Sequence, residues 1–349
     1  MTGRRDVLGL LLLVASGCER TASGSRDETI SLHGAGATFP FPLYSKWIAE
    51  YNRQNPSVQI NYQSIGSGGG VRQIVARTVD FGATDTPMTA DEARDAPSTI
   101  LHVPTAIGSV VVSYQLPELG QPLRLTSELL ARIFLGEIKR WNDPALLAEN
   151  SGAKLPDGEI SVVTRSDGSG TTAIFTDYLK AVSPLWRERV GAGKSVRWPA
   201  GLGAKGNEGV TGHLKSTPGA IGYTELAYAT QNRLPRAAIK NSAGRFVVPT
   251  PDASTAAAVA VPMPESLHVS LADAPSDTAY PIASYTYVLV YANTDDAVKG
   301  AALARFLWWA THEGQKFARE LDYAPLPSGI VAQVEARLKS LRAGGQPAL

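Results

Sequence analysis

The sequence has one cysteine, Cys18, in 349 residues, and no second thiol with which it could form an internal disulfide. It has no basic excess either, because 33 lysines and arginines stand against 32 aspartates and glutamates. Proteins that bind the nucleic-acid backbone show such an excess or a basic stripe, and neither is present. We therefore expect no nucleic acid as a partner.

The N-terminal apolar run, residues 7–14, is too short to cross a bilayer as a helix. It follows two arginines and precedes the small residues 15–17 and Cys18. This order of charged, apolar and small residues is typical of a bacterial export signal. The signal predicts a protein that works outside the cytoplasm, which disfavours ATP, NAD and similar cofactors. We expect no cofactor.

The end of this signal, "ASGC", resembles the lipobox of bacterial lipoproteins, in which the cysteine is acylated after cleavage. We predict an export signal with a lipobox over residues 1–18 and lipidation at Cys18. Residues 19–28 are polar and poor in large apolar side chains, which predicts a flexible tether. Ordinary signal cleavage, with Cys18 incidental, is the alternative.

The rest of the chain contains strands that alternate with helices, and its length divides by default into two domains. Three units share the order strand, glycine-rich loop, helix. Their predicted strands cover residues 29–32, 58–62 and 160–163, and the helices that follow cover residues 43–51, 71–78 and 173–182. This alternation predicts parallel α/β sheets, in which ligands bind beyond the carboxyl ends of the strands.

Further elements follow from apolar patterning. Two near-continuous apolar or β-branched runs predict strands at residues 107–114 and 285–291. Helices are predicted at residues 126–135, 209–215, 301–321 and 328–341. The proline-rich residues 248–264 are predicted to be surface connections.

Three loops combine glycines with hydroxyl residues: "HGAGATFP", "SIGSGGG" and "TRSDGSGTT". Each lies between a predicted strand and a predicted helix. The first N–H groups of a helix have no internal partner and the peptide dipoles add positive charge there, so such a site favours an anion. Glycines let the backbone approach closely, and serine or threonine adds donors. Three such loops in one chain predict one shared anion.

Each loop taken alone is better explained as an ordinary capped helix start with turn glycines, and only the set of three favours an anion site. "GAGATF" fails as a dinucleotide fingerprint, because Phe39 replaces the third glycine and Pro40 follows it. "GSGGGV" is not a Walker A loop, because no lysine follows its last glycine.

An arginine and an aspartate lie two residues apart at the start of the third loop. Arg165 and Asp167 project to the same side of an extended segment. Asp167 can therefore hold the guanidinium of Arg165 while its other donors face a ligand. A surface ion pair of little energetic value is the alternative.

The segment "VDFGATDTPM" places Asp85 after a short predicted strand, residues 79–83. A carboxylate among anion-binding loops should repel the ligand unless the ligand carries a proton. An ionised aspartate only accepts hydrogen bonds, so it would accept one from protonated phosphate and oppose fully ionised sulfate. The alternative is that Asp85 caps a helix around residues 89–94.

Eight segments, in order along the chain, resemble the phosphate-binding protein of the bacterial high-affinity phosphate ABC transporter. They are "GAGATFPFPLYSKW", "NYQSIGSGGGV", "VDFGATDTPM", "LGEIKRWNDPA", "TRSDGSGTT", "RWPAGLGAKGNEGV", "PGAIGYTELAYA" and "LDYAPLP". The similarity extends from about Ser31 to the C-terminus and is weak over residues 252–277.

The resemblance implies an α/β fold of the two-lobed periplasmic-binding-protein kind, the type II Venus flytrap, with two crossings in the hinge. We expect lobe I at residues 29–105 and 284–349, and lobe II at residues 106–283. The crossings would lie near residues 104–109 and 280–284. The family implies a binding protein with no catalytic residue and no metal.

The resemblance also implies the ligands of one phosphate ion. They come from the first loop, the second loop, the segment with the aspartate, and the third loop: Thr38, the amide of Phe39, Ser67, Asp85 as proton acceptor, Arg165, Ser169, Gly170 and Thr171. Asp167 supports Arg165.

The expected partners are inorganic phosphate and the membrane permease subunits of the phosphate ABC transporter. We expect a monomer in the periplasm or at the cell surface, attached to the membrane through a lipid at Cys18.

Other functions are open at this point. A serine hydrolase or phosphatase could use Ser169, but the nucleophile needs a base, and His33 is the only candidate among five histidines. A receptor for sulfate or molybdate is a second possibility, against which Asp85 argues because those ions offer no proton near neutral pH. A scaffold with a vestigial pocket is a third.

Overall fold

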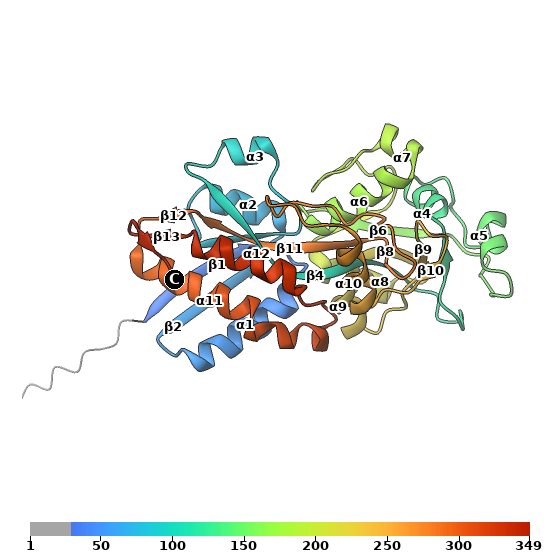
Figure 1. Cartoon of the computed structure of the whole chain (residues 1–349). Coiled ribbons are helices and arrows are strands. Elements are labelled where there is room, and N and C mark those ends of the chain that lie inside the picture. The colour runs from blue at the N-terminus through green and yellow to red at the C-terminus, as the bar shows by residue number, and fades with distance from the viewer. Residues whose placement is uncertain (1–28) are drawn as a thin grey trace, which may run out of the picture.

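The computed structural model describes residues 29–349; the predicted export signal, Cys18 and the predicted tether lie outside the described residues. The described chain forms an α/β fold around an eight-stranded sheet with the order β2-β1-β3-β11-β4-β8-β6-β7 (Figure 1). These strands are β1 (Ile30–Gly36), β2 (Val58–Ser64), β3 (Phe81–Thr84), β4 (Ile100–Tyr114), β6 (Ser161–Arg165), β7 (Leu202–Ala204), β8 (Ala220–Glu225) and β11 (Ala283–Tyr291).

Helices surround both ends of this sheet (Figure 1). One end carries α1 (Phe41–Gln54), α2 (Ser67–Val75), α3 (Ala90–Arg94), α11 (Ala297–Thr311) and α12 (Ser328–Lys339). The other carries α4 (Ser127–Phe134), α5 (Pro144–Glu149), α6 (Gly170–Val182), α7 (Pro184–Arg189), α8 (Gly206–Ser216), α9 (Leu226–Gln231) and α10 (Pro251–Ala260).

Two small sheets and two 3₁₀ turns complete the described chain. The sheets are β5 (Arg124–Leu125) with β9 (Ala238–Lys240) and β10 (Phe246–Val247), and β12 (Asn293–Thr294) with β13 (Arg342–Ala343) and β14 (Gln346–Pro347). The 3₁₀ turns are η1 (Glu313–Phe317) and η2 (Arg319–Leu321). Among residues 29–349, no helix is both long and apolar enough to cross a membrane.

The sheet is parallel at both ends and antiparallel in the middle. β1 runs parallel to β2 and β3, and β6 runs parallel to β7 and β8, as the alternating pattern predicts. β11 is antiparallel to β3 and β4, and β4 is antiparallel to β8, so the sheet is mixed and the predicted parallel pairing holds only for the strands at its two ends. The antiparallel pairing joins segments that are distant in the sequence, so no local sequence pattern could predict it.

β4 belongs to both halves of the molecule. Its residues 100–109 pair with β11, and its residues 110–114 pair with β8. Thirteen of its fifteen residues are buried, which explains why an uninterrupted apolar run marks it in the sequence.

α2 begins earlier than predicted, because its first turn contains the three glycines of the second loop. The sequence pattern predicted a helix at residues 71–78, but the observed helix is Ser67–Val75. Gly66 precedes it with a φ of 88°, a conformation that glycine adopts without strain. A Cβ on Gly70 would lie 2.6 Å from the Cα of Gly36, so close packing requires glycine there although glycine is a poor helix former.

Two predictions for the C-terminal part of the chain are wrong: the end of one helix, and a surface connection that contains a helix. The predicted helix 301–321 ends at Thr311, because His312 leaves the helical conformation with φ −119° and ψ −90°, and η1 and η2 follow. The side chain of Gln315 then donates to the carbonyls of Ala310 and Thr105. The predicted surface connection at residues 248–264 contains α10, whose Ser254 hydroxyl lies 2.7 Å from that of Ser109 in β4. Proline at the first turn of α10 is compatible with a helix start, so proline content misled the prediction.

Candidate functional site

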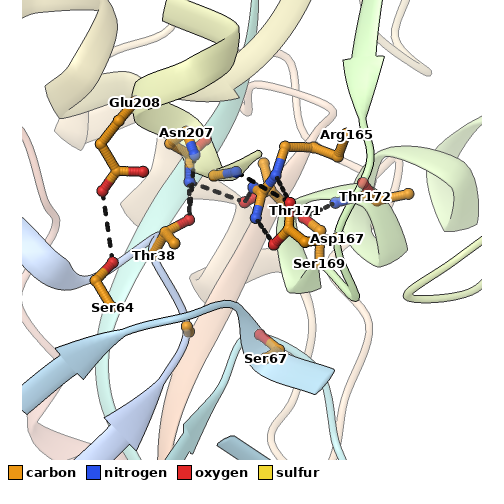
Figure 2. A network of polar contacts seen from close by, with 12 residues as sticks. Thr38, Ser64, Ser67, Arg165, Asp167, Ser169, Thr171, Thr172, Asn207 and Glu208 are labelled. Carbon is orange, nitrogen blue, oxygen red and sulfur yellow. Dashed lines mark hydrogen bonds and ion pairs between the residues drawn. The ribbon is translucent and has the colours of Figure 1, made fainter. Parts of the chain in front are cut away.

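The predicted anion ligands lie on several strand ends and helix starts that meet at one place (Figure 2). Thr38 follows β1, Ser67 begins α2, Asp85 follows β3, Arg165 ends β6, and Ser169 is the N-cap of α6. All five side chains are buried. Their elements come from both ends of the large sheet, so the site lies between the two halves of the molecule.

The second and third loops touch directly. The amide of Gly68 donates to the carbonyl of Gly168 over 2.8 Å. A Cβ on Gly170 would lie 2.3 Å from both Asp85 Oδ2 and Ser67 Oγ. The start of α6 therefore packs against the start of α2, and a side chain at position 170 would hold these two helix ends apart.

Arg165 carries the positive charge of the site. Its Nε donates to Asp167 Oδ1 over 2.8 Å and its Nη2 to Asp167 Oδ2 over 2.6 Å. The side chain of Arg165 is only 1% exposed and that of Asp167 13%, so this is not a surface ion pair. Its Nη1 points to the hydroxyl of Thr171 at 3.3 Å. Asp167 therefore holds one side of the guanidinium group, and the other side, with Nη1, faces the site.

The carboxyl of Asp167 is kept ionised by these contacts. Burial acts to raise its pKa, but hydrogen bonds and charge from Arg165 and the amide of Gly206 outweigh that effect. The pKa of Asp167 consequently lies below its ordinary value. A permanent counter-ion for Arg165 limits the net positive charge of the site.

Asp85 is the carboxylate among these donors. Thr286 donates to its Oδ1 over 2.8 Å, and the Ser67 hydroxyl donates to its Oδ2 over 3.2 Å. Complete burial raises the pKa of Asp85 to about 7, although the hydrogen bonds from Thr286 and Ser67 oppose this rise. Asp85 does not cap α3, because the side chain of Thr89 accepts from Glu92 N and fills that position.

Backbone amides complete the donor set. The amides of Gly170 and Thr171 lie in the first turn of α6 and have no acceptor among residues 29–349. The amide of Phe39 likewise has no acceptor within the described part of the chain, while the ring of Phe39 is buried against Tyr323. Free amides at a helix start favour an anion.

The serine-hydrolase alternative finds no support in this geometry. Ser169 Oγ accepts a hydrogen bond from Thr172 N over 3.0 Å, and no histidine contacts it among the described residues. The backbone amide of His33, in β1, donates to Asp80. Ser169 therefore acts as a helix cap, without the base that a nucleophile requires.

The site also contains residues to which the sequence assigned no role. Asn207, in α8, donates from Nδ2 to Thr38 Oγ1 over 2.8 Å and to Thr171 Oγ1 over 3.2 Å. Tyr228 donates to the carbonyl of Thr38 over 2.7 Å. Asn207 lies within "RWPAGLGAKGNEGV", one of the segments that resemble the phosphate-binding family. Residue spacing could not predict its contact with Thr38, which lies 169 residues away in the sequence.

An ion pair also crosses between the halves of the molecule. Lys194 Nζ lies 2.7 Å from Glu92 Oε2, and both side chains are partly buried, at 12% and 27% exposure. Glu92 is the residue that completes the cap of α3, and the carbonyl of Lys194 accepts from the amide of Ser169.

Taken together, hydroxyls, free amides and the unpaired side of a guanidinium converge at one buried place, together with one carboxylate. A fold with two α/β halves and such a site between them defines the class of two-lobed solute-binding proteins. Consistent with this class, a family model described as a PBP superfamily domain matches residues 21–313.

Curated relatives narrow the class. The chain is 45% identical over 344 residues to the phosphate-binding protein PstS of Pasteurella multocida. This match covers 97% of this chain and 96% of that protein. It is 44% identical over 317 residues to the phosphate-binding protein PstS of Xylella fastidiosa, over 90% and 86% of the two chains. The chain belongs to the PstS family of phosphate-binding proteins.

Solved structures agree with the fold. The high-affinity periplasmic phosphate-binding protein PfluDING, solved with bound phosphate, has a TM-score of 0.72 to this chain. The match covers 88% of this chain and 93% of that one at 22% identity. The family and the two-lobed α/β fold predicted from the sequence are thereby confirmed.

Proposed function

We propose that this protein captures inorganic phosphate between its two lobes, outside the cytoplasm, and delivers it to the permease of an ABC transporter for import. It is a binding protein and not an enzyme, as its family membership indicates. The observation that carries the choice of ligand is Asp85, a buried hydrogen-bond acceptor within a set of donors.

The proposed ligands are those that the resemblance implied: Thr38, the amide of Phe39, Ser67, Asp85, Arg165, Ser169, Gly170 and Thr171. Their support is that free amides, hydroxyls and the free side of Arg165 converge in one buried place. Hydrogen bonds to a charged group contribute roughly 1.5–3 kcal/mol each, and micromolar affinity requires about 8 kcal/mol. Several such bonds are sufficient even after the cost of ordering the lobes.

The proposed lobes are residues 29–105 with 284–349, and residues 106–283. Because phosphate would contact both lobes, it would favour the closed arrangement by contacts that exist only there. The contacts between Gly68 and Gly168 and between Lys194 and Glu92 would form in the same arrangement. A permease that recognises the closed arrangement would then receive loaded protein.

The proposed membrane anchor and tether are supported by the sequence alone. Lipidation at Cys18 would anchor the protein at the membrane surface, in the periplasm or at the cell surface, and a tether over residues 19–28 would let it reach the permease. We propose a monomer, because one chain supplies every group of the site.

The test is calorimetric titration of the purified protein, stripped of carried-over ligand, with phosphate, arsenate and sulfate. Phosphate and arsenate are expected to bind because both carry a proton near neutral pH, and sulfate is expected neither to bind nor to compete. Sulfate competing as well as phosphate would rule out the role of Asp85, and absence of phosphate binding would rule out the function.

Asp85→Asn is the matching variant. An amide can donate to a fully ionised oxygen where the carboxylate repels it, so discrimination between phosphate and sulfate should fall by about tenfold or more. Competition titrations measure this ratio. A ratio equal to that of the parent would contradict the assignment.

A further inference from the structure

Asn207 connects two threonine hydroxyls of the site that come from opposite lobes (Figure 2). It is the second residue of α8, and its side chain is completely buried. Its Nδ2 donates to Thr38 Oγ1 over 2.8 Å and to Thr171 Oγ1 over 3.2 Å. Its Oδ1 accepts from the amide of Glu225 over 3.0 Å.

The contact with Glu225 fixes which way the amide of Asn207 faces. A backbone N–H can only donate, so the oxygen of Asn207 must face Glu225 and the NH₂ group must face the threonines. Thr38 and Thr171 consequently accept from Asn207. Arg165 Nη1, at 3.3 Å from Thr171 Oγ1, can also only donate.

This arrangement determines what the two hydroxyls can do. A hydroxyl has one proton, and a hydroxyl that accepts from Asn207 keeps this proton for another partner. Building on the proposed phosphate function, we propose that Asn207 is a positioning residue that makes Thr38 and Thr171 donors to the bound anion. Because the two threonines lie on different lobes, Asn207 prepares both sides of the site through one side chain.

Asn207→Asp tests this with almost no change of shape. A carboxylate only accepts, so both hydroxyl protons would turn towards it and away from phosphate, and its charge would also repel the ligand. The expected result is a loss of phosphate affinity on the order of 100-fold or more, measured by calorimetry.

Asn150→Asp is the matched control. Asn150 is also buried, donates from Nδ2 to the carbonyls of Arg124 and Leu146, and accepts at Oδ1 from Arg124 N. It contacts no residue of the site, so this variant should lower the melting temperature but leave the phosphate Kd within about twofold of the parent. Equal losses of affinity in the two variants would overturn the proposal.

A pH series distinguishes proton direction from a merely structural role. The charged and titratable groups around Asn207 are the same in parent and variant: Asp85, Arg165, Asp167, Glu208 and Glu225. The ratio of the two Kd values therefore reports the introduced carboxyl together with its coupling to these groups. This ratio should shrink as the pH falls, because the introduced carboxyl becomes a donor again when protonated; a ratio that is constant with pH would overturn the proposal.

A second measurement does not depend on the variant being folded. Neutron diffraction from the phosphate complex of the parent would locate the hydroxyl deuterons of Thr38 and Thr171. Both are expected to point at phosphate oxygens, and deuterons pointing at Asn207 would overturn the inference. If the parent binds no phosphate, the proposed function is wrong. If the parent binds phosphate and the Asn207→Asp variant binds it equally well, only the inference about Asn207 is wrong.

Discussion

At the scale of single residues, the buried carboxyl of Asp85, to which we assign the choice of ligand, lowers the stability of the fold. Burial raises its pKa to about 7 from an ordinary value of 3.8, so the folded protein binds this proton more tightly than the unfolded chain does. In the arrangement that the structure shows, the group that would accept a hydrogen bond from phosphate is therefore poorly solvated, and its two hydroxyl partners, Thr286 and Ser67, belong to the same proposed lobe as Asp85 itself.

The sign of the pH effect follows from this raised pKa. Below about pH 4 the carboxyl is protonated in both states, and it imposes no penalty. As the pH rises to about 7, the unfolded chain ionises freely while the folded chain resists, so stability falls. Above about pH 7 the full penalty applies, on the order of 4 kcal/mol.

Asp85→Asn removes this ionisation. We expect the ligand-free variant to be as stable as the parent near pH 4 and more stable at pH 8, as measured by urea unfolding midpoints at the two pH values. Glu225, whose pKa is also raised well above normal by burial, adds a similar pH dependence to both proteins and cancels in the comparison. Equal differences between variant and parent at both pH values would contradict the raised pKa of Asp85.

At the scale of elements, the helix starts are shaped to let two loops approach. Gly170 opens α6, and a Cβ there would lie 2.3 Å from Asp85 Oδ2 and Ser67 Oγ. Its φ is not positive, so the backbone alone would accept alanine without strain. The need for glycine at this position comes only from the opposite loop.

Gly170→Ala should accordingly weaken the approach of the two loops without destabilising the fold. We expect weaker phosphate binding by about tenfold or more, with a melting temperature of the ligand-free protein that is unchanged or slightly higher, since alanine favours a helix. Calorimetry and thermal unfolding measure the two effects.

Gly212→Ala is the control for this experiment, because a Cβ on Gly212 in α8 meets nothing within 4 Å. It should show the small stabilisation and leave phosphate affinity unchanged. If Gly170→Ala binds phosphate as well as Gly212→Ala does, the close approach of the two loops is not required for binding.

At the scale of the whole molecule, the ion pair between Lys194 and Glu92 joins the proposed lobes beside the site. Both side chains are partly buried, so salt screens their attraction less than it screens a fully exposed pair. The pair would exist only when the lobes are closed, and it would therefore slow the release of ligand.

Lys194→Met should increase the rate of phosphate release by about two- to tenfold with a smaller change in the rate of binding. Stopped-flow fluorescence measures both rates. Lys46→Met is a suitable comparison, because Lys46 pairs with Glu50 inside α1 and joins no second lobe. A release rate for Lys194→Met equal to that of Lys46→Met would show that the pair does not act on closure.

The loops of the site could be predicted from the sequence because their chemistry is local. Glycine and hydroxyl residues between a strand and a helix create free amides whatever the rest of the fold is. The spacing of Arg165 and Asp167 likewise set their pairing, which the structure shows over 2.6 Å and 2.8 Å. The start of α2 was predicted four residues late, since three glycines argue against a helix until close packing requires them.

Contacts between distant segments were beyond such reasoning. Asn207 meets Thr38 across 169 residues, and Lys194 meets Glu92 across 102, with no periodicity that links them. The antiparallel placement of β11 between β3 and β4 has the same origin.

The sequence by itself determined the three units of strand, glycine-rich loop and helix, where free backbone donors occur, and which carboxyl could accept a hydrogen bond from a protonated ligand. Only the tertiary structure decided that helix starts from both halves meet, because their meeting depends on the order of strands in the sheet. The burial of Asp85 and the direction of the Asn207 amide were decided there too, since dielectric environment and hydrogen-bond direction depend on neighbours that the chain brings together only by folding.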